Sequence, residues 1–178
     1  EYERFPAIYD IFWEKSPEKT QAEIDAIYDY KIVDHDTFIN NRHSDYFGGK
    51  TSDVFTFHKH TAIFVHAFAL AYSKTNAPKY LNWAHKSCDV FWKIRDPETN
   101  MVGYCPQWKD DKTGGIEPTT VRAYLRAYQA HPDPMFLERG LAYMRAYQNH
   151  VWKPTSTNPL WAKSAALAYS LSGDDSFL

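Results

Sequence analysis

The stretch from residue 53 to residue 73 constrains the fold more than any other part of the chain. Its large apolar side chains fall on nearly every side of a helix: Val54, Phe55, Phe57, Ile63, Phe64, Val65, Phe68, Leu70 and Tyr72. A helix that is apolar all round is buried on all sides. We therefore predict an inner helix over residues 53–74, with other elements packed around it.

The segment over residues 77–94 has a different pattern. Apolar residues recur at three- and four-residue spacing, which is typical of a helix with one buried face. They are Tyr80, Leu81, Ala84, Cys88 and Phe91, with Lys79, Asn82, His85, Lys86, Asp89 and Lys93 on the other side. A fully buried helix followed by a one-faced helix predicts an inner–outer hairpin.

Parts of this pattern recur later in the chain. "ALAYSKTNAPKYL" at 69–81 matches "ALAYSLSGDDSFL" at 166–178, and "AYLRAYQAHPDP" at 123–134 is similar to "AYMRAYQNHVWKP" at 142–154. We expect helices over residues 3–14, 17–31, 53–74, 77–94, 117–131, 134–150 and 158–172. The remaining long segments, 33–52 and 95–116, are expected to be irregular, and long loops in compact domains are usually functional or disordered.

The second "ALAYS" copy also predicts how the chain is organised. By its earlier counterpart, 166–178 is a linker from an inner helix to an outer one. We therefore expect residues 1–178 to be a single helical-hairpin domain that is part of a larger protein. Leu160, Leu167 and Leu171 are expected to leave an apolar flank, which further helices or another subunit would cover near 160–178.

Composition excludes several functions. The chain has 20 basic and 22 acidic residues and a net charge of −2, so no basic surface for nucleic acid is expected. It has no apolar run long enough to span a membrane. Two cysteines make neither a disulfide framework nor a zinc cluster. Aromatic residues reach 17%, which fits either sugar stacking or a large core.

At "ALAYSLSGDDSFL", "ALAYSKTNAPKYLNWA" and "FWKIRDPETNMVGY", the sequence resembles the (α/α) toroid carbohydrate-active enzymes. This group includes six-hairpin glycosidases, sugar epimerases and helical-barrel polysaccharide lyases. The resemblance covers most of residues 53–178. It implies an all-α fold whose helical hairpins form part of an (α/α) toroid, incomplete in this chain. It also implies a sugar-binding cleft at one end, built from the loops between hairpins.

The polar loop "DHDTFINNRHSDYFGG", residues 34–49, is the first candidate site. Arg42 could clamp a uronate carboxylate with two hydrogen bonds, and His43 could move a proton near neutral pH. We expect Tyr46 to be catalytic together with this pair and Asn41 to bind the substrate. The pair Arg42–His43 is similar to the Arg next to a His that serves as base and metal ligand in helical-barrel pectate lyases. The alternative is a solvated loop with Asx turns.

Three histidines accompany the inner helix. His58 and His60 would lie about 200° apart around a helix, so they could not hold one ion from its middle. If Thr56 caps the helix, both fall in the first turn, where the positive helix end favours a neutral imidazole. We expect His58 to be catalytic and His43, His58 and His60 to be the ligands of a possible divalent metal. His66, two turns deeper, is expected to be a bonded core residue.

The loop "MVGYCPQWKDD", residues 101–111, is the second candidate. Trp108 is expected to stack on a sugar, and Gln107 and Tyr104 to bind its hydroxyls, although a loop tryptophan can equally cover a core. Glu117 precedes Pro118 at a helix start, where a carboxylate can cap the helix or act as a general acid.

These observations predict an enzyme that cleaves a polysaccharide or oligosaccharide, with lyase action on an acidic, uronate-containing glycan favoured. Such an enzyme is expected in the periplasm or outside the cell. A glycoside hydrolase is the alternative on the same fold, and would need two carboxylates from Asp34, Asp36, Asp45 and Glu117. A non-catalytic helical-repeat binding module is the other alternative, although the repeats lack one fixed period.

Overall fold

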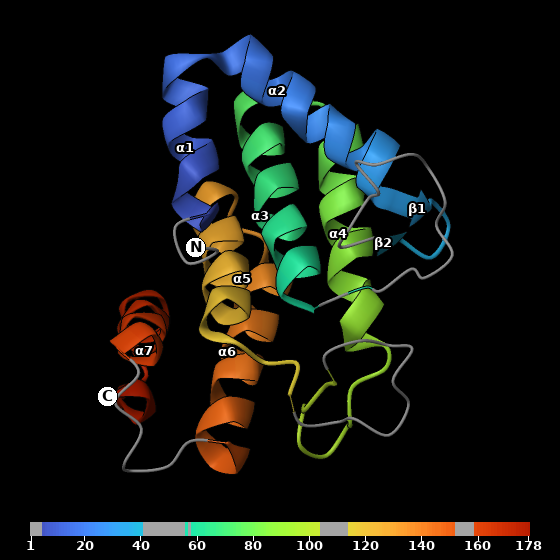
Figure 1. Ribbon diagram of the computed structural model, residues 1–178. Helices are drawn as coiled ribbons and strands as arrows, with labels where there is room; N and C mark the ends of the chain where they lie inside the picture. The colour runs from blue at the N-terminus through green and yellow to red at the C-terminus, as the bar shows by residue number, and fades with distance from the viewer. Residues whose placement is uncertain (1–4, 41–55, 57, 104–113, 152–158) are drawn as a thin grey trace.

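In the computed structural model, residues 5–40, 56, 58–103, 114–151 and 159–178 are described (Figure 1). The helices are α1 Phe5–Lys15, α2 Pro17–Ala26, α3 His58–Thr75, α4 Pro78–Trp92, α5 Pro118–Ala130, α6 Pro134–His150 and α7 Pro159–Ser172. Shorter elements are a π-helical turn η2 Ile27–Lys31, strands β1 Ile32–Asp34 and β2 Ile39–Asn40, and a 3₁₀ turn η3 Asp175–Phe177. No helix in these ranges is both long and apolar enough to cross a lipid bilayer.

The helices lie where the sequence pattern places them, and proline sets most of their starts. Proline is the first residue of five helices: α2, α4, α5, α6 and α7. Its fixed φ suits the first helical turn, where its missing N–H costs nothing. The start of the expected helix 53–74 is confirmed only from His58, since residues 53–55 and 57 lie outside the described residues.

The small hairpin β1–β2 corrects the expectation of an all-α chain with an irregular 33–52 segment. Its strands pair antiparallel, with Ile32 opposite Asn40 and Asp34 opposite Ile39. The Asp34 carboxylate accepts hydrogen bonds from the Asp36 and Thr37 N–H groups, at 2.9 and 3.1 Å, and so closes the turn. Phe38 adopts a positive φ of 60° and is buried against the helices. The buried Phe38 ring anchors the hairpin in the core.

The core lies between two layers of helices. Twelve of the 18 residues of α3 are buried, against five of the 15 residues of α4. Helix α3 packs mainly on α5 and on α4, and α5 packs in turn on α6 and α7. Figure 1 shows α4 running antiparallel to α3 and α6 antiparallel to α5. The predicted inner–outer hairpin of α3 and α4 is therefore confirmed.

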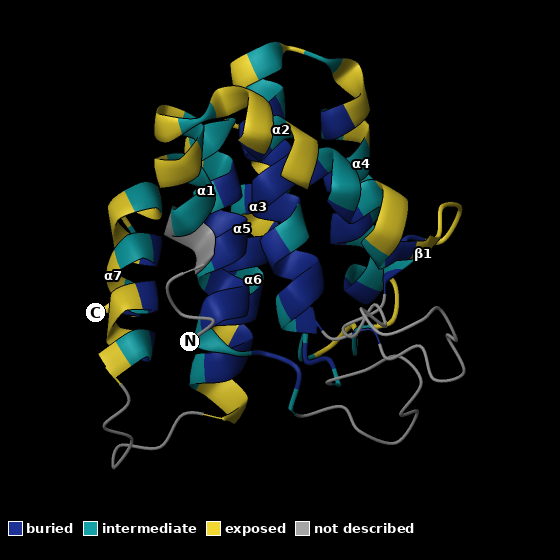
Figure 2. Cartoon of the chain, turned by 45° about the horizontal axis from the view of Figure 1, so that its top comes forward, coloured by how far each residue is buried: buried dark blue, intermediate teal, exposed yellow. Residues whose placement is uncertain are grey.

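The described helices form successive hairpins and do not close a ring. Helices α3, α5 and α7 follow one another side by side, and α4 and α6 cover the first two. Figure 2 shows the difference in burial: α3 and α5 are buried along most of their length, whereas α7 carries exposed residues along one side. The structure is thus mostly helical, with hairpins of the kind that the sequence repeats predict.

Candidate functional site

Helices α3 and α5 begin at the same end of the molecule (Figure 1), and two contacts join their starts. The Nδ1–H group of His58 donates to the Gly115 carbonyl oxygen at 3.0 Å. Lys59 Nζ lies 3.1 and 3.3 Å from the two carboxylate oxygens of Glu117. We call these four residues the mouth.

Position 115 can hold only glycine. Its N–H donates to the Val102 carbonyl oxygen at 2.9 Å, so the chain before α5 lies directly against residues 102–103. A Cβ atom on Gly115 would lie 2.0 Å from the Gly103 carbonyl oxygen, which no small adjustment could relieve. The close approach of these two backbones holds the carbonyl group that His58 binds.

The β-hairpin is tied to the same end of α3. The Thr56 hydroxyl donates to the Asn40 carbonyl oxygen, and Asn40 Nδ2 donates to the Thr61 hydroxyl, both at 2.7 Å. All three residues are buried. Thr56, which the sequence offered as a possible helix cap, thus donates its hydroxyl proton to the hairpin. Asn40 and Thr56 are the described residues on either side of the segment 41–55, so both flanks of this segment are fixed beside the first turns of α3.

His58 is held as a neutral core residue. Its side chain is only 1% exposed. The ring stacks on Phe91 with centroids 4.4 Å apart and lies edge-to-face with Tyr143 with centroids 4.7 Å apart. Burial lowers the pKa of His58 to about 3. Because a carbonyl oxygen can only accept, Nδ1 carries the proton and Nε2 is a bare acceptor, with no hydrogen-bond partner. In this position His58 fixes the first turn of α3, and solvent does not reach its free nitrogen.

No three His, Cys, Asp or Glu side chains in the described part of the chain lie close enough together to hold a metal ion. His58 Nδ1 is already bonded to a carbonyl group, and His60 is also buried, at 8% exposure. His43, the third expected ligand, lies outside the described residues. The metal site that the sequence predicts therefore stays a prediction, although the Nδ1 atom of His58 cannot be one of its ligands while it donates to a carbonyl oxygen.

His66 is buried in the middle of α3, as predicted for a core histidine, with 1% of its side chain exposed. Its Nε2 atom lies 3.6 Å from an Asp10 carboxylate oxygen on α1. Burial and the nearby Arg126 lower the pKa of His66 to about 3. Burial also raises the pKa of Asp10, which the charges of Arg126 and Lys74 oppose. The contact joins α1 to α3 at a distance from the mouth.

The other predicted site residues fall into two groups. Asn41, Arg42, His43, Asp45, Tyr46, Tyr104, Gln107 and Trp108 lie outside the described residues, and their roles stay predictions. Among the candidate carboxylates, Asp34 closes the β-hairpin turn, and its hydrogen bonds to Thr37 lower its pKa. Glu117 makes no capping hydrogen bond and pairs with Lys59 instead. Lys59 was not singled out from the sequence, because a lysine beside histidines carries no distinctive pattern.

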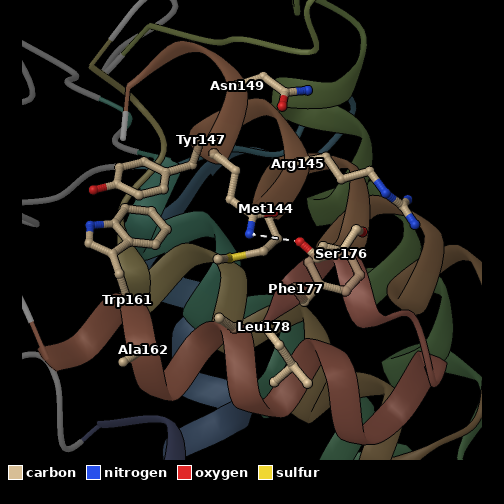
Figure 3. A pocket seen from close by; sticks show the side chains of 11 residues that line it. Met144, Arg145, Tyr147, Asn149, Trp161, Ala162, Ser176, Phe177 and Leu178 are labelled. Atoms are coloured by element: carbon tan, nitrogen blue, oxygen red, sulfur yellow. Dashed lines mark hydrogen bonds between the residues drawn. The ribbon is translucent and has the colours of Figure 1, made fainter. Parts of the chain in front are cut away.

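A groove of about 690 Å³ that the sequence does not predict lies between α6, α7 and η3. Figure 3 shows Trp161 stacked on Tyr147 at one side of it and Arg145, Ser176 and Phe177 at the other. The two stacked ring centroids are 3.2 Å apart. The groove is assembled by tertiary packing, and only the repeated "ALAYS" turn could have indicated it.

The apolar flank that the sequence predicts on α7 is made by different residues. Leu160, Leu167 and Leu171 are half-buried. The exposed apolar residues of α7 are Ala162, Ala166 and Tyr169. The flank is therefore shifted around the helix toward its small side chains.

Comparison with known proteins supplies no relative, because no protein-family model, no curated protein and no solved structure matches the chain.

Proposed function

We propose that the chain belongs to a carbohydrate-active enzyme of the (α/α) toroid type that acts at the mouth, with lyase action on an acidic glycan. The observation that carries the proposal is the joining of α3 and α5 at their starts. The bond from His58 to Gly115 and the pair of Lys59 and Glu117 hold together the flanks of two polar segments, 41–55 and 104–113. These segments contain the residues that the sequence suggests for chemistry and sugar binding.

In the proposed reaction, Arg42 binds the uronate carboxylate and withdraws electron density from the neighbouring carbon. His43 or Tyr46 removes the proton from that carbon. The bond to the leaving sugar oxygen breaks, a carbon–carbon double bond forms, and the leaving oxygen takes up a proton. Asn41, Tyr104, Gln107 and Trp108 hold the sugar rings. His58 supports this site from the interior, by fixing where α3 begins.

Lys59 and Glu117 give the mouth a polar edge in the described structure. Each side chain is about one quarter exposed, at 23% and 26%, so a bound glycan could reach the pair. Lys59 favours an acidic substrate, and Glu117 holds the lysine in place. The proposed reaction needs no metal, because Arg42 supplies the positive charge that stabilises the anion. An acidic polysaccharide as substrate agrees with a periplasmic or extracellular location.

The test is incubation of the purified chain with a uronate polymer while the ultraviolet absorbance of an unsaturated product is followed. We expect turnover, and we expect Arg42→Ala and His43→Ala to lower it at least a hundredfold with little change in melting temperature. Lys79→Ala is the matched control. Lys79 is a half-exposed cation near the start of α4, at the end of α3 far from the mouth, and its removal should leave turnover unchanged.

The same experiment separates the two alternatives. Release of reducing ends without the absorbance would show a hydrolase. In that case Glu117→Gln should abolish release, because among the described residues Glu117 is the candidate carboxylate that lies at the mouth. Binding of the polymer without any product would show a non-catalytic module. Full lyase activity in Arg42→Ala would refute the assignment of the site.

A further inference from the structure

The turn that ends α7 has the same backbone hydrogen bond as the turn that ends α3. The Asn76 N–H donates to the Tyr72 carbonyl oxygen at 2.8 Å, and the Gly173 N–H donates to that of Tyr169 at 2.8 Å. Both donors have a positive φ, 55° at Asn76 and 68° at Gly173. This left-handed residue is a common way to end a helix.

The side-chain hydroxyls repeat as well. The Thr75 hydroxyl donates to the Ala71 carbonyl oxygen at 2.7 Å, and the Ser172 hydroxyl donates to that of Ala168 at 2.8 Å. Each hydroxyl oxygen then accepts from the N–H group two residues later, Ala77 or Asp174, at 3.2 Å. The turn after α3 leads directly into the outer helix α4, so the turn after α7 has the geometry of an inner-to-outer connection.

The element after each turn is anchored by an aromatic ring. Tyr80 in α4, Phe136 in α6 and Phe177 in η3 follow their turns at the same spacing, and at most 2% of each is exposed. The start of η3 is also capped as α6 is. The Asp133 carboxylate accepts from the Met135 N–H at 2.9 Å, and the Asp174 carboxylate accepts from the Ser176 N–H at 2.9 Å. The three residues of η3 therefore have the features of the first turn of a helix.

The position of η3 beside α6 repeats the position of α6 beside α4. His85 on α4 bonds to the capping Asp133 of α6 at 2.6 Å, and Arg145 on α6 bonds to the capping Asp174 at 2.6 Å. The His85 ring lies 5.8 Å from the Phe136 ring, and the Arg145 guanidinium lies 4.9 Å from the Phe177 ring. A helix running on from η3 would therefore lie along α6, as α6 lies along α4.

The groove described above lies on this path. It is bounded by Met144 and Gln148 of α6, by Trp161 and Ala162 of α7, and by Phe177 of η3. The side chain of Gln148 donates to the Ser176 carbonyl oxygen, a bond of 3.2 Å that fixes η3 at one end of the groove.

We propose that the groove between α6 and α7 is the seat of an amphipathic outer helix that continues directly from η3 and packs on α7 as α4 packs on α3. Its apolar face lies over Trp161, Ala162 and Ala165. The turn already sets its direction, and Phe177 already supplies its first apolar contact. The inference does not depend on the proposed function.

The experiment gives the chain a surrogate for this helix. Leu178 matches Leu81 in the repeat, so residues 82–94, copied from the chain's own α4, are appended after Leu178. The control extension carries Ser at the positions copied from Ala84, Cys88 and Phe91, which are buried in α4. We expect the first extension to raise the melting temperature by about 5 °C over the control. It should also slow amide exchange in α7 at least tenfold.

A second variant shows whether the gain in melting temperature comes from packing in the groove. Ala162→Glu changes an exposed residue that lines the groove, so it should leave the melting temperature of the unextended chain unchanged and remove the gain from the extension. Equal exchange in α7 with both extensions would overturn the proposal. So would light scattering that shows the unextended chain as a dimer with α7 protected, because a second copy would then occupy the groove.

Discussion

Helices α3 and α7 contain the same five residues, Ala-Leu-Ala-Tyr-Ser, in two different environments. In α3, at most 2% of Ala69, Leu70 and Ala71 is exposed. In α7, Ala166 is exposed and Leu167 is half-buried, and only Ala168 is fully covered. Three of the 14 residues of α7 are buried, against twelve of the 18 in α3.

The difference shows which part of the fold is local and which is not. Helix formation and the turn that follows are identical in the two copies, so they come from the local sequence. Burial comes from the neighbours: α3 packs on α1, α2, α4 and α5, whereas α7 packs on α5, α6 and η3. The same leucine therefore contributes different amounts of buried area, and burial of a whole leucine side chain stabilises by about 1.5–3 kcal/mol.

The largest expected effect is that of a charge placed at matched positions of the two copies. Ala69→Asp puts a carboxylate into the core of α3, where it has no partner, and should cost more than about 4 kcal/mol of unfolding free energy. Ala166→Asp, at the same position of α7, should cost less than about 0.5 kcal/mol. Denaturant titration of both variants measures the difference. Similar losses in both would mean that α7 is covered in solution.

Helices α3 and α7 also differ in how their contributions to stability depend on pH. Helix α3 carries two buried histidines with lowered pKa, and α7 contains none. The folded-state pKa of His58 is about 3, against 6.5 for the exposed group, so the unfolded chain binds the extra proton between these values. The contribution of His58 is therefore complete above pH 6.5. It is lost as the pH falls, by up to about 1.4 kcal/mol per pH unit.

His58→Asn tests this directly, because the amide can still donate to the Gly115 carbonyl oxygen but does not titrate. Unfolding free energy measured between pH 7 and pH 5 should fall less steeply in this variant than in the original chain. An unchanged slope would show that His58 is not buried in its neutral form.

The smallest expected effect tests whether the two turns are equivalent. Gly173→Ala should cost about 1 kcal/mol, because alanine is disfavoured at positive φ, while its Cβ would meet no atom within 4 Å. Asn76→Gly, at the matching position, should change stability by less than about 0.5 kcal/mol. A large loss from Asn76→Gly would mean that the asparagine side chain does something that the glycine of the other turn cannot replace.

Local features explain why the helices could be predicted from the sequence. Periodic apolar residues, prolines at first turns and the capping Asp133 act within a few residues of one another. The β-hairpin was missed because its stability depends on burial of Phe38 under distant helices. The depth of His58 was missed for the same reason: its partner, Gly115, is 57 residues away, and helical periodicity carries no information about that contact.

The glycine at position 115 has a further consequence, for how such a protein could change over time. His58 binds a main-chain oxygen, so this contact between α3 and the chain before α5 depends on where the backbone of Gly115 lies and not on a side chain at that position. The close approach of the two backbones requires that position 115 stay glycine, because a Cβ atom there would meet the carbonyl oxygen of residue 103. The contact can therefore persist while side chains around it change, as long as the glycine is kept, which separates preserving a fold from varying its surface.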